Sequence, residues 1–152
     1  MVHVRRATAD DVSILLPLVA AYWKFEDISG FHAQGIAPQL ERLLSEPNLG
    51  AGWIALAGNT PVGYLLAVYV FSLEHKGLTA EIDEFFVSPS ERGEGVGSQL
   101  LRIAEAEFLR LGCTNVSLQL SRSNDGARRF YRRQGYEDRS GYELLDKTLH
   151  AG

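Results

Sequence analysis

A strand, a glycine-rich turn and a helix follow one another in residues 81–101, and this succession constrains the fold most. β-forming residues before Ser88 predict the strand, and apolar residues at helical spacing after Ser98 predict the helix. Between them, residues 92–98 place three glycines where the helix begins. Glycine leaves the first-turn N–H groups uncovered, and these donors favour a bound anion together with the helix dipole. We therefore predict a pyrophosphate-binding turn.

Two common phosphate-binding motifs do not match this turn. A P-loop requires lysine and then serine or threonine after its last glycine, whereas Gly97 is followed by serine and glutamine. A dinucleotide-binding turn has the spacing G-x-G-x-x-G, with an acidic residue at the end of the next strand. Here the spacing is Gly93-x-Gly95-x-Gly97, and the next predicted strand ends without an acid. The turn therefore belongs to neither class.

A second segment completes a different pattern. The form Arg92-x-x-Gly95-x-Gly97 after a strand resembles the acetyl-CoA loop of the GNAT family of N-acetyltransferases. Residues 124–136, with Phe130-Tyr131 at the centre, are similar to the family segment N-x-x-A-x-x-F-Y-x-x-x-G-F/Y. The order of the two segments and the strand–helix context also agree. The resemblance covers residues 81–136 most closely and extends over nearly the whole chain.

This resemblance implies acetyl-CoA as the cofactor. The diphosphate would contact the backbone of the turn, and the pantetheine arm would enter a gap between the strand before Ser88 and the strand near Val116. The cofactor-binding residues that the resemblance implies are Phe86, Val87, Arg92, Gly93, Glu94, Gly95, Val96, Gly97, Ser98, Asn124, Ala127 and Tyr131. Asn124 has a second interpretation as a helix N-cap, and the two roles are compatible.

A base is needed because an alkylammonium group, with a pKa near ~10.4, must lose a proton before it attacks a thioester. Asp83 is the first candidate and Glu84 the alternative, since neighbours on a regular strand face opposite ways. Partial burial in a central strand would raise the pKa of such a carboxyl. The run Asp83 to Val87 is similar to E-D-F-F-V of polyamine-type members, where the first acid accepts the amine proton. A structural role, as an arginine partner or at a wet strand end, stays open.

Tyr131 is the candidate acid for the departing thiolate. Its short helix must pack toward the sheet, so the ring would be buried and the hydroxyl could point into the strand gap. The family motif around Tyr131 implies the catalytic role. A purely structural tyrosine is the alternative.

The resemblance places the acceptor site in the loop of residues 23–35 and in a last hairpin. Acidic and aromatic residues in or near these segments suit an amine through charge attraction and cation–π contact. The candidates are Phe25, Glu26, Asp27, Tyr69, Glu74 and Asp83. The alternative is that they are core aromatics and a solvated rim.

Composition excludes several other functions. A chain of 152 residues predicts one domain, residues 1–152. A net charge of −4 argues against nonspecific nucleic-acid binding. The single cysteine, Cys113, rules out an internal disulfide, and the four histidines lack the spacing of a zinc site, so no metal is expected. Without an apolar run of ~18 residues or a signal core, we expect a cytoplasmic protein that does not bind membranes.

The fold class that follows is α/β, a GNAT-like fold with a central mixed, mostly antiparallel sheet, a splayed strand pair and about four helices. Strands are predicted at residues 2–5, 53–57, 62–71, 78–87 and 115–120. The first helix would begin near Thr8 or Asp10 and bury Leu15, Leu18, Val19 and Tyr22, and the second would have Pro38 in its first turn. Gly112 would end the third helix, residues 124–134 form the fourth, and residues 136–137 and 142–149 close the fold as a hairpin.

The sequence thus predicts an acetyl-CoA-dependent N-acetyltransferase that acts by direct transfer. The expected acceptor is a primary amine of a small molecule, such as a polyamine, an amino acid or an aminoglycoside-like compound. Modification of a protein lysine or N-terminus is one alternative, and a non-catalytic sensor module that binds acyl-CoA is another. The residues do not decide between a monomer and a homodimer.

Overall fold

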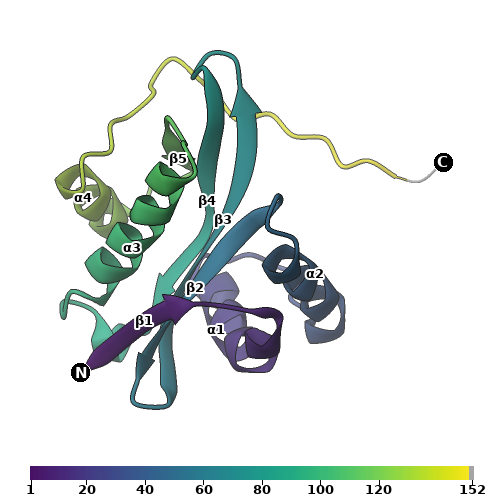
Figure 1. Cartoon of the computed structure of the whole chain (residues 1–152), viewed down its shortest axis with the longest axis vertical. Helices are drawn as coiled ribbons and strands as arrows, with labels where there is room; N and C mark the ends of the chain where they lie inside the picture. Colours follow the sequence, from purple (N-terminus) through teal and green to yellow (C-terminus); the bar gives the residue numbers. More distant parts are fainter. Residues whose placement is uncertain (151–152) are drawn as a thin grey trace. The chain divides into compact units, whose positions relative to one another are not determined.

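The computed structural model describes residues 1–150 and divides into two compact units, a larger one of Met1–Gln119 and a smaller one that begins at Leu120. The larger unit contains the strands β1 (Val2–Arg6), β2 (Gly50–Ala57), β3 (Thr60–Ser72), β4 (Gly77–Val87) and β5 (Val116–Leu118) (Figure 1). Its helices are α1 (Val12–Phe25), α2 (Ala33–Ser45) and α3 (Val96–Arg110), with short 3-10 turns at Ala9–Asp11 and Pro89–Glu91. The smaller unit contains α4 (Asp125–Arg133).

The strands form one sheet in the order β1-β2-β3-β4-β5. Neighbours are antiparallel from β1 to β4, whereas β5 runs parallel to β4. A parallel neighbour requires a long crossover, which α3 provides. The predicted mixed, mostly antiparallel sheet with four α-helices is therefore confirmed.

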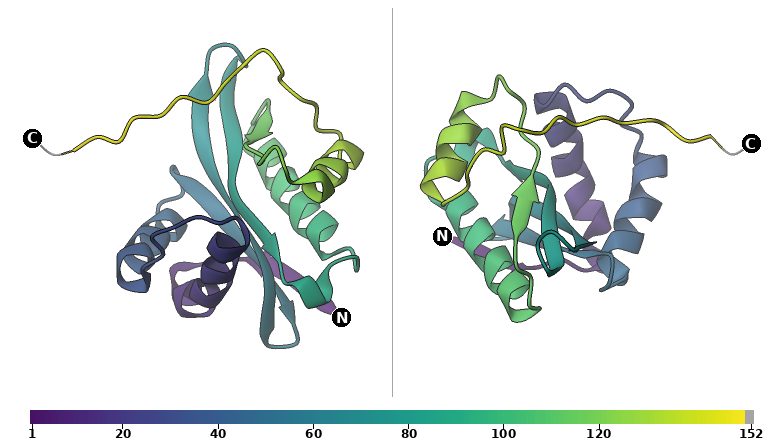
Figure 2. Two further views of the ribbon diagram at one scale, coloured as in Figure 1. Left: turned by 180° about the vertical axis from the view of Figure 1, so that it is seen from behind. Right: turned by 90° about the horizontal axis from the view of Figure 1, so that it is seen from above.

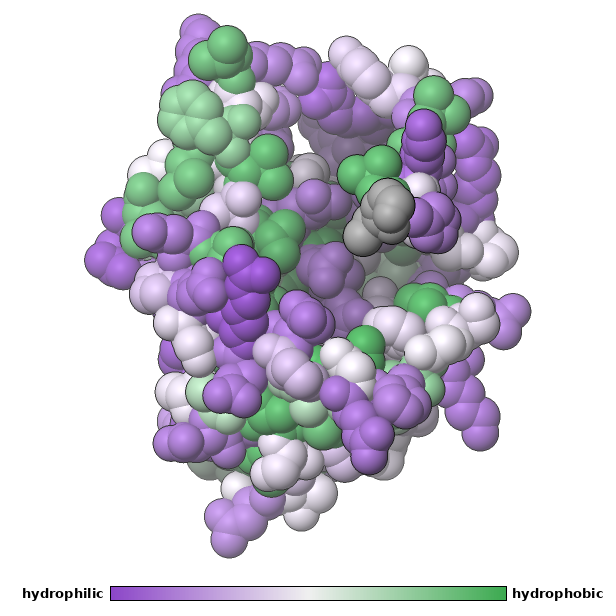
Figure 3. Space-filling model, turned by 90° about the vertical axis from the view of Figure 1, so that its right-hand side faces the viewer, coloured by the Kyte–Doolittle hydropathy of each residue, from purple (hydrophilic) through white to green (hydrophobic). Residues whose placement is uncertain are grey.

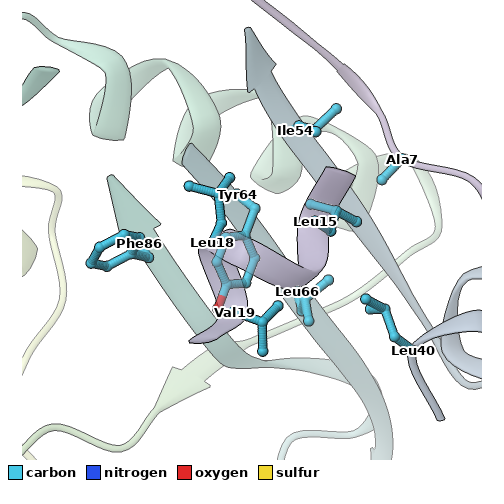
Figure 4. Packing of buried hydrophobic residues seen from close by; sticks show 9 residues of the cluster. All are labelled: Ala7, Leu15, Leu18, Val19, Leu40, Ile54, Tyr64, Leu66 and Phe86. Carbon is cyan, nitrogen blue, oxygen red and sulfur yellow. The ribbon is translucent and has the colours of Figure 1, made fainter. Parts of the chain in front are cut away.

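Helices cover both faces of the sheet in the larger unit, with α1 and α2 on one face and α3 on the other (Figures 1 and 2). The α1–α2 face holds a cluster of buried side chains: Ala7, Leu15, Leu18, Val19, Leu40, Ile54, Tyr64, Leu66 and Phe86 (Figure 4). On the other face, α3 buries Val96, Leu100, Leu101, Ala104 and Phe108. Each fully buried large apolar side chain contributes about 1.5–3 kcal/mol, so both faces stabilise the sheet that carries β4.

One residue of β4 interrupts its pairing with β3. Leu66 pairs with Glu84 and Ala67 with Ile82, so that Asp83 is an extra residue in the ladder, a β-bulge. Residues paired across an antiparallel ladder share a face of the sheet. Glu84 therefore lies on the α1–α2 face with Leu66, while Ile82 lies on the opposite face. Without the bulge, residues 82 and 84 would lie on the same face.

The helix boundaries correct two sequence predictions. The segment 23–35 is not irregular throughout, because α1 continues to Phe25 and α2 begins at Ala33. Pro38 consequently lies inside α2 rather than in its first turn. The earlier start has a local cause, since the His32 side chain caps the helix by accepting a hydrogen bond from the N–H of Gly35 at 3.2 Å.

The predicted closing hairpin is wrong. Residues 134–150 contain no strand. Leu144, Leu145 and Leu149 are 69%, 87% and 85% exposed. Two neighbouring leucines break the alternation that would give a strand one apolar face, and the segment pairs with no strand in the described part of the chain.

Further apolar side chains reach the surface of the larger unit at the end of the β3–β4 hairpin, where Phe71 and Leu73 are exposed. Figure 3 shows one face of the structure, on which hydrophilic side chains surround separate apolar patches. Among residues 1–150, no helix combines the length and hydropathy that a bilayer crossing requires. The same residues contain no group of three or more His, Cys, Asp or Glu side chains placed to hold a metal ion.

An ion pair between the partly exposed Arg5 and the buried Asp11 fixes β1 to the start of α1. Both terminal nitrogens of Arg5 donate to the Asp11 carboxylate at 2.8 Å, and the Thr8 N–H donates to it at 2.8 Å. These hydrogen bonds, chiefly those from Arg5, lower the pKa of Asp11 below its ordinary value of 3.8. A carboxylate with several such partners is costly to replace.

We predict that Asp11→Asn lowers the free energy of unfolding at pH 7 by about 1–3 kcal/mol, measured by urea denaturation. The difference from wild type should shrink as the pH falls below about 4, because a lowered pKa stabilises only while the carboxyl is ionised. Glu46→Gln, which removes the exposed pair with Arg42, is the control and should cost about 0.5 kcal/mol or less. Equal losses in the two variants would contradict this assignment.

Candidate active site

The glycine-rich turn has the predicted backbone. Gly93 and Gly95 both have φ +82, a conformation that glycine adopts without strain, and Gly95 is the N-cap of α3. A Cβ atom at either glycine would meet no heavy atom within 4 Å, so the backbone of the turn borders open space. The first N–H groups of α3 have no acceptor within the helix and lie at the positive end of its dipole. The turn can therefore hold an anion such as a diphosphate.

Arg92 connects this turn to the end of α1. Its Nε donates to the Val87 carbonyl at 2.9 Å. Its guanidinium carbon lies 4.6 Å from the ring centroid of Phe25 and 5.5 Å from that of Phe86, at cation–π distance. The structure thus brings Phe25, predicted for the acceptor site, next to Phe86, Val87 and Arg92, predicted for the cofactor site.

The pairing of β4 with β5 ends early. The last paired residues are Ile82 and Leu118, whereas β4 continues to Val87. Within the described residues, the later part of β4 is therefore paired only with β3. This agrees with the predicted splayed strand pair, and it leaves β4 backbone groups available to the amides of a pantetheine chain.

Glu84 is held by two aromatic side chains from other elements. Its carboxylate accepts hydrogen bonds from Trp23 Nε1 and from the Tyr64 hydroxyl, each at 2.8 Å. Burial raises the pKa of Glu84, and the charge of Asp83 adds to the rise, while the two hydrogen bonds oppose it. Burial beside this carboxylate also raises the pKa of Tyr64 far above its ordinary value. Glu84 is therefore a fixed, partly desolvated carboxylate.

Asp83, the bulge residue, has a different environment. Its side chain forms no hydrogen bond with any of residues 1–150. The residue keeps more than a third of its surface exposed, yet partial burial of the carboxyl raises its pKa. The expectation that Asp83 and Glu84 face opposite ways assumed a regular strand, which this is not. The charges of Asp83 and Glu84 both raise the pKa of Tyr22 and of Tyr64, so the two carboxyl groups lie near the same two tyrosines.

Of the other acceptor candidates, Glu26 lies near the carboxylates, whereas Tyr69 does not. Glu26 caps the C-terminus of α1, and its charge raises the pKa of Tyr22. Asp27 follows with φ 56 in the left-handed region. Tyr69 does not adjoin the carboxylates, because it lies on the α3 face with its ring 6.2 Å from that of Phe108. Glu74 lies in the β3–β4 turn, 3.9 Å from His75.

The chain resembles proteins of a known family over most of its length. Residues 17–136 match the family described as the Acetyltransferase (GNAT) family. The chain belongs to this family. The aminoalkylphosphonate N-acetyltransferase of Salmonella typhimurium is 33% identical over 136 residues, which cover 89% of this chain and 84% of that protein. This GNAT protein is accordingly an N-acetyltransferase.

Solved structures agree with the GNAT fold. An integron cassette protein, HFX_CASS3, from the mobile metagenome of Cole Harbour Salt Marsh has a TM-score of 0.84 at 30% identity, covering 98% of this chain and 91% of its own. A predicted acetyltransferase from Clostridium acetobutylicum, solved with acetyl-CoA, has a TM-score of 0.82 at 20% identity and covers 96% of each chain. At that identity the second likeness shows the fold alone.

The smaller unit of the GNAT protein contains the second predicted motif. Asn124 Oδ1 accepts from the Ala127 N–H at 3.1 Å, which confirms the helix-cap interpretation; contact with pantetheine stays a prediction. The Tyr131 ring lies 5.4 Å from Phe130 and 5.5 Å from Tyr136. Its role as the acid also stays a prediction.

Sequence reasoning missed Trp23 and Tyr64 as partners of Glu84 and treated Tyr22 only as part of an apolar stripe. Trp23 and Tyr64 are 61 and 20 positions from Glu84 in the chain. Their one local signal is chemical, since buried Trp and Tyr need a partner for their polar atom.

We predict that Tyr64→Phe lowers the free energy of unfolding at pH 7 by about 1–3 kcal/mol, because the buried Glu84 carboxylate loses a donor. Tyr69→Phe is the matched control. The Tyr69 hydroxyl is buried and has no hydrogen-bond partner among residues 1–150, so its removal should be nearly neutral. Urea denaturation of both variants makes the comparison, and a cost for Tyr69→Phe as large as that for Tyr64→Phe would refute the assignment.

Proposed function

We propose that this GNAT protein transfers the acetyl group of acetyl-CoA directly to a primary amine of a small molecule. One observation carries the proposal: a glycine turn with open backbone at the N-terminus of α3 and two carboxyl groups on β4 lie on the same strand–turn–helix segment, and burial raises the pKa of both carboxyls. The name of the Salmonella relative gives an aminoalkylphosphonate as its substrate, which supports a small molecule over a protein.

The residues of the turn fit the cofactor. Backbone N–H groups of residues 92–98 would hold the diphosphate, with Gly93 and Gly95 leaving the approach open. Backbone groups at Phe86 and Val87, on the part of β4 that β5 does not pair, would hold the pantetheine arm. When bound, acetyl-CoA supplies an acetyl thioester. The chain's own task is then to position the amine and to remove its proton.

The two carboxylates divide this task. Glu84, fixed by Trp23 and Tyr64, would attract and hold the ammonium group. Asp83, whose side chain forms no hydrogen bond within the described residues, would accept the proton. Burial raises the pKa of Asp83, which makes it a stronger base than an ordinary aspartate.

The reaction is balanced by a second proton transfer. A primary ammonium group loses two protons when it becomes an amide: Asp83 would take the first, after which the nitrogen would bond to the acyl carbon and the carbon–sulfur bond would break. Tyr131 would donate the proton that leaves with the thiol product. The second nitrogen proton would replace the one that Tyr131 gives up. No bond to the protein forms at any stage.

We predict that Gly95→Ala weakens acetyl-CoA binding about tenfold or more, measured by calorimetry. An alanine side chain is strained at φ +82, and its Cβ would project into the space before the turn. Gly112→Ala is the control, because Gly112 has φ +85, has equally open surroundings and lies after the C-terminal end of α3. Both variants should lose similar stability, and only Gly95→Ala should lose affinity. Equal affinity in the two variants would remove the turn from the site.

We predict that Asp83→Asn lowers kcat about 10²–10⁴-fold in a thiol-release assay over a panel of amines, with acetyl-CoA binding retained. In the wild type, kcat/KM should rise with pH as the Asp83 carboxyl ionises, above its ordinary pKa of 3.8, and this acidic limb should disappear in the variant. Asp10→Asn, at an exposed aspartate before α1, is the control and should leave kcat unchanged.

The same assay separates the rival functions. Turnover with lysine peptides but with no small amine would indicate a protein acetyltransferase. Acetyl-CoA binding without turnover on any amine or peptide would indicate a sensor module. Unchanged turnover in Asp83→Asn would exclude Asp83 as the base.

A further inference from the structure

Tyr22 lies beside the carboxylate pair. It belongs to the last turn of α1, and its ring meets that of Tyr64 edge-on at 6.3 Å and that of Phe86 at 6.1 Å. Tyr64 donates to Glu84, and Phe86 lies two residues further along β4 on the same face. These contacts place the Tyr22 side chain next to Glu84.

The Tyr22 hydroxyl differs from the other polar groups around Glu84. Trp23 Nε1 and the Tyr64 hydroxyl both donate to the Glu84 carboxylate. The Tyr22 hydroxyl forms no hydrogen bond with any residue in the described part of the chain. The residue is only half-buried, and its oxygen is not among the buried atoms that lack a partner. The hydroxyl therefore remains accessible to a ligand.

Negative charge surrounds this hydroxyl. Burial, together with the charges of Glu26, Glu84 and Asp83, raises the pKa of Tyr22 to about 12. The phenol is therefore neutral near pH 7, and its oxygen can accept a hydrogen bond. An accessible acceptor among three carboxylates favours a cationic donor over a neutral or anionic ligand.

We propose that the Tyr22 hydroxyl binds the ammonium group of the acceptor, as the third acceptor beside Glu84 and Asp83. The ligand class is a primary alkylammonium. Such a group has three N–H donors, which match three acceptors. Once Asp83 has taken one proton, Glu84 and Tyr22 hold the two remaining hydrogens and so keep the nitrogen at the site. The inference rests on the proposed amine acetylation at this site and adds a substrate-binding residue to it.

The test removes only the hydroxyl. Tyr22→Phe keeps the ring contacts with Tyr64 and Phe86 and should raise KM for the amine on the order of tenfold to a hundredfold. KM for acetyl-CoA should not change. Tyr69→Phe, which removes a hydroxyl on the opposite face of the sheet, should leave both constants unchanged. An amine KM within twofold of wild type, or an equal effect of Tyr69→Phe, would overturn the proposal.

A binding measurement separates this inference from the proposed function. The probes are n-butylamine and 1-butanol, which differ at the ammonium group, and NMR titration of wild type and Tyr22→Phe gives their affinities. We expect wild type to prefer the amine, and Tyr22→Phe to lose about tenfold or more of that preference. An unchanged preference in the variant, or none in wild type, overturns the role of Tyr22. A third outcome separates the two proposals. If Tyr22→Phe loses the preference for the amine but the wild type acetylates no amine, the role of Tyr22 is supported and the transferase proposal is refuted.

Discussion

The site depends on the carboxylate of Glu84, which is partly buried and accepts hydrogen bonds from Trp23 and Tyr64. A charge in such a place is tolerated only if donors replace the water it has lost, and the two aromatic donors do so. They come from α1 and β3, so the carboxylate holds these elements in register with β4. The bulge at Asp83 is what turns Glu84 toward them, because a regular strand would place it on the α3 face with Ile82.

The raised pKa values of Glu84 and Asp83 reduce the stability of the fold as the pH rises. For an acid whose pKa is higher in the folded than in the unfolded state, folding favours the protonated form. The contribution of Glu84 and Asp83 to stability is therefore greatest below their ordinary pKa values and falls as the pH rises through their raised values. The apolar layers on both faces of the sheet offset this cost. Two neighbouring carboxyl groups of raised pKa, kept together against that tendency, indicate a site maintained for function.

Arg92 links the two halves of the site in the larger unit. Its guanidinium lies over Phe25 and Phe86 and bonds to the Val87 carbonyl, so the turn that would hold the diphosphate also contacts the end of α1. Tyr22, Glu26 and Phe25 all lie at that end. A ligand bound at the turn and an amine bound at the carboxylates would therefore both contact Phe86 and the last turn of α1.

The sequence by itself determined the local features. Helical spacing, β-forming runs and glycines at turns act over a few residues, so the strand–turn–helix segment and the Asn124 cap were predictable. Only the tertiary structure decided the partners of Glu84, the bulge at Asp83, the contact of Arg92 with Phe25, and the absence of a strand in residues 134–150. These features depend on atoms that come together from distant positions in the chain and on whether a strand has a pairing partner. Local residue patterns determine neither.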